Sequence, residues 1–301
     1  MPRKPSPCFR PSVESLEDRQ LMSVSVSFDP NLHGGRLEIT GDQAGNSISI
    51  LNNGDGHVTV VAIGQGALNY SDVSEVVVLA GNGPNAVHYF QQGDDLNPSG
   101  NQLRPFVLDV DLGMGESQFQ ADLLGHAVLA GMHLTVNGGG NHTSNFEAQG
   151  VDIGAQGSLV IVADDSPSRP GPTTSRRKVT TSVAYSGVKE GGLAVMLGNG
   201  MDRRHLQLSL DATFAPGSTR DEGDEFMIQG GRFADSLEMF LHDPAGLNPS
   251  GEIDGGGGFN TATHFDNVKA VNCQRDIVTR FSGPAVKVPP LGGGLGHIVH
   301  F

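Results

Sequence analysis

The sequence predicts an all-β fold. Among all-β folds it favours a parallel β-helix or a similar solenoid of short stacked strands. Three observations carry this prediction. Apolar residues alternate with polar ones in period two, glycine-rich corners recur between such runs, and no amphipathic helix of three turns is found. Alternation in period two is typical of half-buried strands. The corners are unevenly spaced, so a β-sandwich with Greek-key links stays open as the alternative.

The expected strands begin directly after residue 23. In the first of them, Val24, Val26 and Phe28 alternate with two serines. Comparable runs follow at Leu37–Thr40, Ser47–Ile50, Val58–Val61, Val76–Leu79, Val107–Leu112, His133–Val136, Leu159–Val162, Leu193–Leu197, Leu206–Leu210 and Phe226–Ile228. When units of this kind stack, each buries its apolar positions against its neighbours.

Between the strands the chain repeats one kind of corner, in which a glycine-rich turn is followed by a polar residue. The clearest examples are residues 81–87, 113–119, 138–144, 198–202 and 256–260. Glycine permits positive φ or a close approach of two backbones, and the polar residue that follows caps the turn. The corners therefore predict chain reversals at which successive units touch.

A second repetition indicates internal duplication, because Leu96–Gly100 recurs as Leu247–Gly251. The organisation that follows has five parts. They are a sorting segment, expected to be disordered, at 1–23, a first β-repeat half at 24–163, a Pro- and Ser-rich linker at 164–179, a second half at 180–280 and a Gly- and Pro-rich tail at 281–301.

Charge and cysteine content exclude several functional classes. The formal net charge is −14, from 19 basic and 33 acidic side chains, and such a field repels the phosphates of nucleic acid. Cys8 and Cys273 are too few and too far apart for a disulfide framework or a metal motif. No apolar run is long enough to span a bilayer as a helix, so we expect no transmembrane segment.

The most specific signal lies near the N-terminus, between Val13 and Ser23, where no apolar block of an ordinary secretory signal is present. This segment resembles the LEPR-XLL motif found at the N-termini of planctomycete surface and extracellular proteins. The residues in register include Leu16, Glu17, Arg19 and Leu21, and Met22 stands where a second Leu is usual. The resemblance implies export or surface sorting.

The corners also resemble the G-G-x-G-x-D-x-U-x nonapeptide of RTX calcium-binding proteins. At the position of its aspartate this chain mostly carries uncharged or imidazole side chains, namely Asn85, Ser117, His142 and Asn260. Calcium needs several anionic oxygens, so a full calcium roll is not expected, and the polar residues are interpreted as turn caps. The weak calcium candidates that remain are Asp202, Asp224 and Asp235. Beyond calcium no cofactor is expected.

No catalytic residue is predicted. His264 and Asp266 are expected to point outward from one strand, as an acid–base pair or as two solvated residues. Paired carboxylates occur at Asp109 with Asp111, Asp94–Asp95, Asp164–Asp165 and Asp221–Glu222. We therefore expect an exported structural or adhesive protein of the cell surface or extracellular space, with cell-envelope or matrix components as partners. A carbohydrate-active lyase or hydrolase on a solenoid scaffold is the alternative.

Overall fold

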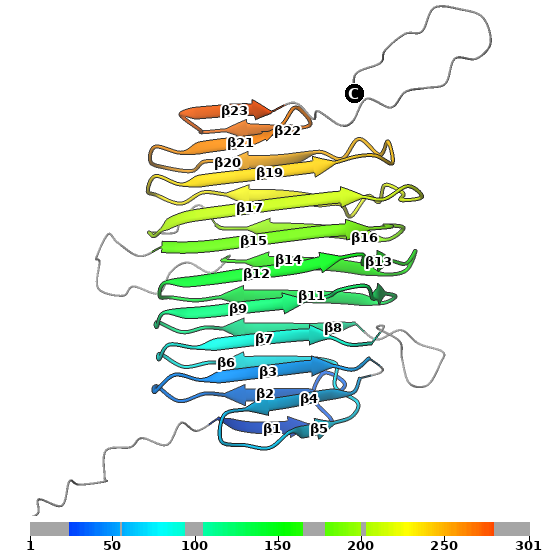
Figure 1. The fold of residues 1–301 in the computed structure, drawn as a ribbon, viewed down its shortest axis with the longest axis vertical. Coiled ribbons are helices and arrows are strands. Elements are labelled where there is room, and N and C mark those ends of the chain that lie inside the picture. Colours follow the sequence, from blue (N-terminus) through cyan, green and yellow to red (C-terminus); the bar gives the residue numbers. More distant parts are fainter. Residues whose placement is uncertain (1–23, 55, 94–104, 165–177, 200–202, 280–301) are drawn as a thin grey trace, which may run out of the picture.

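The computed structural model is a β-solenoid in which two long sheets are built from successive coils of the chain (Figure 1). It describes residues 24–54, 56–93, 105–164, 178–199 and 203–279. Within these ranges the chain forms strands and turns, and no helix capable of crossing a membrane is found. The predicted all-β class and the stack of short strands are confirmed. Parallel pairing between coils replaces the Greek-key arrangement of the alternative.

The first sheet, sheet A, has ten strands in the described part of the chain. In spatial order they are β1 (Ser25–Asp29), β2 (Arg36–Thr40), β6 (Glu75–Leu79), β8 (Phe106–Asp111), β11 (Gly131–Asn137), β14 (Ser158–Ala163), β16 (Gly192–Leu197), β18 (Glu225–Gln229), β20 (Gly251–Asp254) and β22 (Val268–Val271). From β2 onward all neighbours are parallel.

The second sheet, sheet B, has eleven strands over the same ranges. In spatial order they are β5 (Leu68–Tyr70), β4 (Val58–Ala62), β3 (Ser47–Asn52), β7 (Ala86–Gln91), β9 (Ser117–Asp122), β12 (His142–Gln149), β15 (Lys178–Gly187), β17 (His205–Phe214), β19 (Ser236–His242), β21 (Thr261–Phe265) and β23 (Arg275–Thr279). Two short strands, β10 (Ala127–Val128) and β13 (Asp152–Ile153), form a separate parallel pair. In the sequence, each of them follows a strand of sheet B and precedes a strand of sheet A.

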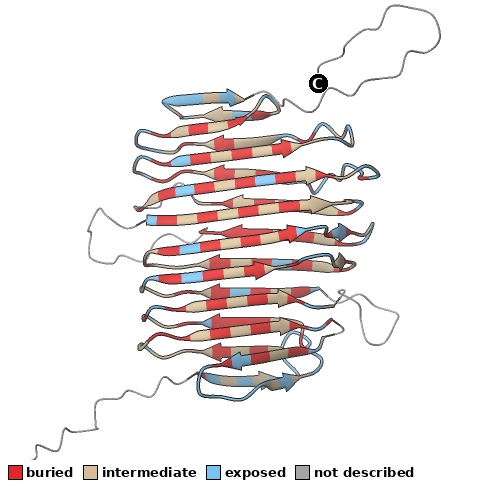
Figure 2. Ribbon diagram, viewed as in Figure 1, coloured by how far each residue is buried: buried red, intermediate tan, exposed pale blue. Residues whose placement is uncertain are grey.

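The core lies between the two sheets and is built from columns of equivalent residues. In sheet A, Leu134, Ile161 and Val195 stand one above another in register, and all are buried. Inward and outward positions alternate along nearly every strand, as Figure 2 shows. Because the strands are parallel and in register, each inward side chain contacts its counterparts in the coils above and below.

The glycine corners bring backbones closer together than a side chain would permit. Gly113 has a φ of +70°, and a Cβ added there would lie 1.8 Å from the carbonyl oxygen of Gly81 in the preceding coil. Only glycine satisfies both the positive φ and this separation. The interpretation of the corners as stacked turns is therefore confirmed.

The two ends of the solenoid differ. At the N-terminal end the pairs β1–β2, β3–β4 and β4–β5 are antiparallel, and the rings of Phe28 and Tyr70 pack over the core with centroids 5.5 Å apart. At the C-terminal end the last described strands remain parallel. There the inward column of sheet B ends in Val278, which is 53% exposed.

The predicted halves form one continuous stack. Strand β14 pairs with β16, and β12 pairs with β15, so both sheets pass from the first half into the second. Asp164, Lys178 and Val179 were assigned to the linker but belong to this stack, whereas 165–177, 1–23 and 280–301 lie outside the described residues. The linker boundary was wrong because Lys178–Gly187 is rich in Ser and Thr and does not resemble a core strand.

Candidate functional site

The polar residues at the corners form a ladder along one edge of the solenoid. Asn46 N–H donates to Asn85 Oδ1 at 3.0 Å, and Asn85 N–H donates to Ser117 Oγ at 3.3 Å. Toward the other end Asp235 N–H donates to Asn260 Oδ1 at 2.9 Å. Each side chain accepts a backbone hydrogen of the preceding coil. The ladder therefore satisfies backbone groups that the turns would otherwise leave unpaired inside the protein.

The same side chains also close their own turns. Asn85 Nδ2 donates to the carbonyl oxygens of Gly81, Gly83 and Leu112 at 2.9–3.1 Å, and Asn260 Nδ2 donates to Gly257 O at 2.8 Å. An amide provides both a donor and an acceptor, which a carboxylate does not. The interpretation of Asn85, Ser117 and Asn260 as caps is therefore confirmed. His142 was interpreted in the same way, and this was wrong, because its Nε2 pairs with Asp164.

Of the three calcium candidates, the two that the structure describes, Asp224 and Asp235, lie at different sheets. Asp202 lies outside the described residues. Asp235 accepts the backbone hydrogens of Leu206 at 2.8 Å and Gly231 at 2.7 Å, whereas Asp224 precedes β18 of the other sheet. Within the described ranges no group of three or more His, Cys, Asp or Glu side chains is arranged to hold a metal ion.

A buried polar cluster interrupts the core between the two sheets at the middle of the stack. Asp164 Oδ1 lies 2.7 Å from His142 Nε2 and 3.7 Å from Arg204 Nη2, and Thr181 Oγ1 donates to Asp164 Oδ2 at 2.9 Å. Arg204 also donates to the carbonyl oxygens of Gly138 and Gly140. All four side chains are buried.

The electrostatics of this cluster favour an ionised Asp164. Burial alone raises the pKa of its carboxyl, but the charges of His142 and Arg204, with hydrogen bonds from His142 and Thr181, outweigh burial and lower the pKa below its ordinary value. The His–Asp pairing is that of a general base, yet Asp164 is 1% exposed and His142 is 4% exposed. A substrate does not reach these atoms, so the cluster serves the interior of the fold.

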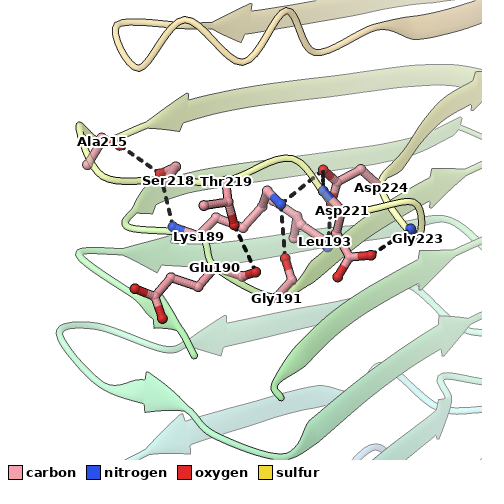
Figure 3. Close-up of polar contacts among 10 residues, drawn as sticks. All are labelled: Lys189, Glu190, Gly191, Leu193, Ala215, Ser218, Thr219, Asp221, Gly223 and Asp224. Atoms are coloured by element: carbon pink, nitrogen blue, oxygen red, sulfur yellow. Dashed lines mark hydrogen bonds and ion pairs between the residues drawn. The ribbon is translucent and has the colours of Figure 1, made fainter. Parts of the chain in front are cut away.

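A second buried ion pair fastens a loop to the neighbouring coil (Figure 3). Lys189 is fully buried, and its Nζ lies 2.9 Å from Asp224 Oδ2 and donates to Gly191 O at 2.9 Å. Around it Lys189 N–H donates to Ser218 Oγ at 3.0 Å, and Thr219 N–H donates to Lys189 O at 2.6 Å. We call Lys189, Ser218, Thr219 and Asp224 the lysine clasp.

The lysine clasp borders a small pocket with a mixed lining. Apolar side chains come from Phe214, Phe226, Leu247 and Pro249, and polar ones from Lys189, Asp224, Arg220 and Ser250. The charges of Lys189 and Asp224 neutralise each other at its base, and Arg220 lies at its rim, where it is exposed. Sequence reasoning missed Lys189, because a single Lys between Val188 and Glu190 carries no pattern that distinguishes it from a surface residue.

Two further sequence hypotheses meet different neighbours in the structure. His264 was expected to point outward beside Asp266, and this was wrong. It is buried on the inward side of β21, and its Nε2 lies 2.8 Å from Asp276 Oδ1 on β23. Asp266 instead follows β21 in a turn.

Of the paired carboxylates, Asp109 and Asp111 both lie on the outer side of sheet A. Partial burial, with the charges of Asp111 and Glu75, raises the pKa of Asp109. Glu75 is itself 2.7 Å from His33 Nδ1. Asp109 and Asp111 lie on β8, and Glu75 lies on the neighbouring strand β6. Arg36 Nη1 lies 3.8 Å from Glu75, so the group is a surface charge network.

The outer side of sheet B carries a row of polar side chains along the long axis of the solenoid. One residue comes from each strand from β3 to β21 in the parallel part of the sheet. We call this set the polar column: Ser49, His88, Gln120, Asn145, Ser182, Ser209, Glu238 and Thr263. Asn145 Nδ2 donates to Gln120 Oε1 at 2.9 Å, and Ser182 Oγ donates to Asn145 Oδ1 at 2.7 Å. Side chains in this column bridge successive coils in its central part.

Beside the polar column runs a second one, the outer column, which combines acidic and apolar side chains. It contains Leu51, Phe90, Asp122, Glu147, Ala184, Asp211 and Phe240. At its C-terminal end Phe240 meets Phe265 with ring centroids 5.0 Å apart, and His242 meets Phe265 at 4.9 Å. This aromatic group lies on the solvent side of the sheet.

Comparison with known proteins gives this chain no relative. No family model matches it, and neither a curated protein nor a solved structure does.

The corner ladder yields a prediction for Asn85. Replacing Asn85 with Ala leaves several buried backbone groups without partners, so the free energy of unfolding should fall by about 1–3 kcal/mol. Urea denaturation followed by circular dichroism measures this. Asn82→Ala, in the same corner but exposed, removes one exposed hydrogen bond and should lower stability by about 0.5 kcal/mol. Equal losses in the two variants would contradict a structural role for the ladder.

Asp164 yields a pH prediction. Its pKa is lower in the folded than in the unfolded chain, so it contributes stability above the unfolded pKa of about 3.9, and this stability is lost as pH falls through the folded pKa. The free energy of unfolding of the Asp164→Asn variant should therefore be about 3–5 kcal/mol lower than that of the wild type at neutral pH. The difference from the wild type should shrink as pH falls below about 4.

Urea unfolding at a series of pH values measures that difference. Glu222→Gln, a carboxyl-to-amide change at an exposed position, is the matched control and should follow the wild type throughout. A gap between Asp164→Asn and the wild type that stays constant across the acid range would refute the ionised carboxylate.

The lysine clasp predicts that Lys189→Ala strands the Asp224 carboxylate, whose side chain is only 12% exposed, and lowers stability by about 3–5 kcal/mol. The double variant Lys189→Met with Asp224→Asn removes both charges and keeps an amide oxygen for the N–H of Leu193, which Asp224 accepts at 3.1 Å. It should recover a substantial part of this loss. Guanidinium unfolding is the measurement, with Glu190→Ala as the exposed neighbouring control. A double variant less stable than the single one would disprove the clasp as an ion pair.

Proposed function

We propose that the protein is an exported, non-catalytic structural or adhesive module of the cell surface or extracellular space. The observation that carries this proposal is the disposition of its ionisable groups. Two ionisable clusters among the described residues, Asp164 with His142 and Lys189 with Asp224, are largely buried and hold coils together. The more accessible pair of His242 with Asp211 lies on the flat outer face of sheet B. The flat outer faces of the sheets are left for contact with other molecules.

The architecture supports this role through its mechanics. A load applied along the long axis is shared by the hydrogen bonds of both parallel ladders and by side-chain bridges such as Asn145 to Gln120. Repeat proteins of this kind distribute stability over neighbouring units and present extended surfaces. Such a body suits a spacer or an adhesive arm that displays a binding face to envelope or matrix components.

The N-terminal segment supports the location. Leu16, Glu17, Arg19 and Leu21 lie outside the described residues, and their resemblance to the LEPR-XLL motif supports export or surface sorting. In this proposal the segment directs the chain outward, and the stack from Val24 onward performs the extracellular task.

The proposal is tested by locating the full chain in its native cell with an epitope inserted in the linker after Pro172. The wild type should appear in the surface or extracellular fraction. A triple variant, Leu16→Ala, Arg19→Ala and Leu21→Ala, should accumulate inside because the sorting residues are removed. Arg10→Ala, a basic residue upstream of the motif, is the matched control and should be exported. Intracellular wild-type protein, or unaffected export of the triple variant, would disprove the proposal.

A further inference from the structure

The aromatic group at the C-terminal end of the outer column has a composition that sheet packing alone does not require. Phe240 and His242 alternate on β19 with the buried residues Met239 and Leu241, so both point away from the core. Phe265 projects from β21 beside them. Aromatic pairs across strands stabilise a sheet, which accounts for the contact between rings.

Pairing does not account for the carboxylate that completes the group. Asp211 on β17 stands in register with Phe240, and its Oδ1 lies 3.2 Å from His242 Nε2. Its side chain is 59% exposed, while that of His242 is 24% exposed. An acceptor that is open to solvent therefore lies directly beside half-buried rings, on three consecutive coils of one flat face.

We propose that Asp211, Phe240, His242 and Phe265 form a binding site for a sugar ring of a neutral polysaccharide. This inference deepens the proposed adhesive function and rests on it. The apolar C–H face of a pyranose packs on aromatic rings, and its hydroxyls donate to a carboxylate. Binding sites commonly combine an apolar surface with a few polar groups that fix orientation.

The rest of the face extends the site along the solenoid. Neighbouring strands are about 4.8 Å apart, so the polar column presents an amide, hydroxyl or carboxyl group at each such step beyond the aromatic group. Ser209 lies on the same strand as Asp211, and Ser182, Asn145 and Gln120 follow on the next three coils. These side chains are donors and acceptors suited to the hydroxyls of further sugar units.

The charges of the two columns favour a neutral polysaccharide over an acidic one. The polar and outer columns contain four carboxylates, from Asp122, Glu147, Asp211 and Glu238, and no Lys or Arg. An anionic polysaccharide that lies along these two columns would meet like charges. Lys178 and Arg275, the first residues of β15 and β23, stand outside the two columns. Hydroxyl groups, in contrast, are hydrogen-bond donors to these carboxylates.

The test is isothermal titration calorimetry of the full chain with cellohexaose, mannohexaose and laminarihexaose as neutral probes, and hexagalacturonate as the anionic probe. At least one neutral probe should bind, and the hexagalacturonate should not. Phe265→Ala and Asp211→Asn should each raise the Kd of the neutral probe by about tenfold or more, equivalent to about 1.4 kcal/mol of binding free energy. Met196→Ala, at a half-buried outward position of sheet A, is the matched control and should bind as the wild type does.

Melting curves of each variant verify folding, and Asp211→Asn keeps the site testable if loss of a ring destabilises the sheet. Absence of binding by every neutral probe, or unchanged binding by Asp211→Asn and Phe265→Ala, would overturn the sugar site and leave the surface location standing. Release of reducing ends from a bound probe would support the sugar site but refute the non-catalytic function. Intracellular retention with intact binding would refute the location alone.

Discussion

In-register stacking of parallel coils is the constraint on which the rest of this structure depends. Every residue in a strand lies about 4.8 Å from its equivalents above and below, so each position must suit a neighbour of the same orientation. Leu134, Ile161 and Val195 meet this requirement as a column of aliphatic side chains. At the corners it brings backbones so close that glycine is required, as Gly113 shows against Gly81. One geometric rule thus produces both the core and its turns.

Polar groups inside the stack follow from the same rule. A corner places a backbone N–H of one coil beside the side chain of the next, so an amide there, such as that of Asn85, pairs with both coils. The core column changes from apolar to polar at Ser144 and Thr181. The carboxylate of Asp164 supplies a partner for Thr181, and Arg204 supplies the compensating charge. We interpret these clusters as devices that fix the register of coils.

The outward positions are free of this packing requirement, and their chemistry therefore carries functional information. On sheet B they form continuous columns that combine hydroxyls, amides and carboxylates with an aromatic group around Phe265. A face of this composition is suited to repeated weak contacts with an extended partner. The buried ion pairs and the exposed face have separate tasks, since the former hold coils together and the latter meets other molecules.

The sequence by itself determined the strand class, the glycine corners and most strands of sheet A, because their inward residues are aliphatic and alternate cleanly, as in Leu159–Val162. It found few strands of sheet B. Strands β12 and β15 carry Ser144 and Thr181 at inward positions, so their alternation contains little apolar contrast. The polar corner residues other than His142 were recognised as caps, since turn chemistry is local.

Only the tertiary structure decided which distant residues meet. The partner of His264 is Asp276 of the next coil, not Asp266 nearby in sequence, and Lys189 meets Asp224 of the neighbouring coil. These pairings depend on the number of residues in each coil, which varies along this chain. The outer column likewise cannot be recognised from the sequence, because Asp211, Phe240 and Phe265 become neighbours only when three coils stack. Local propensity fixes strands and turns, whereas coil length and register fix the sites.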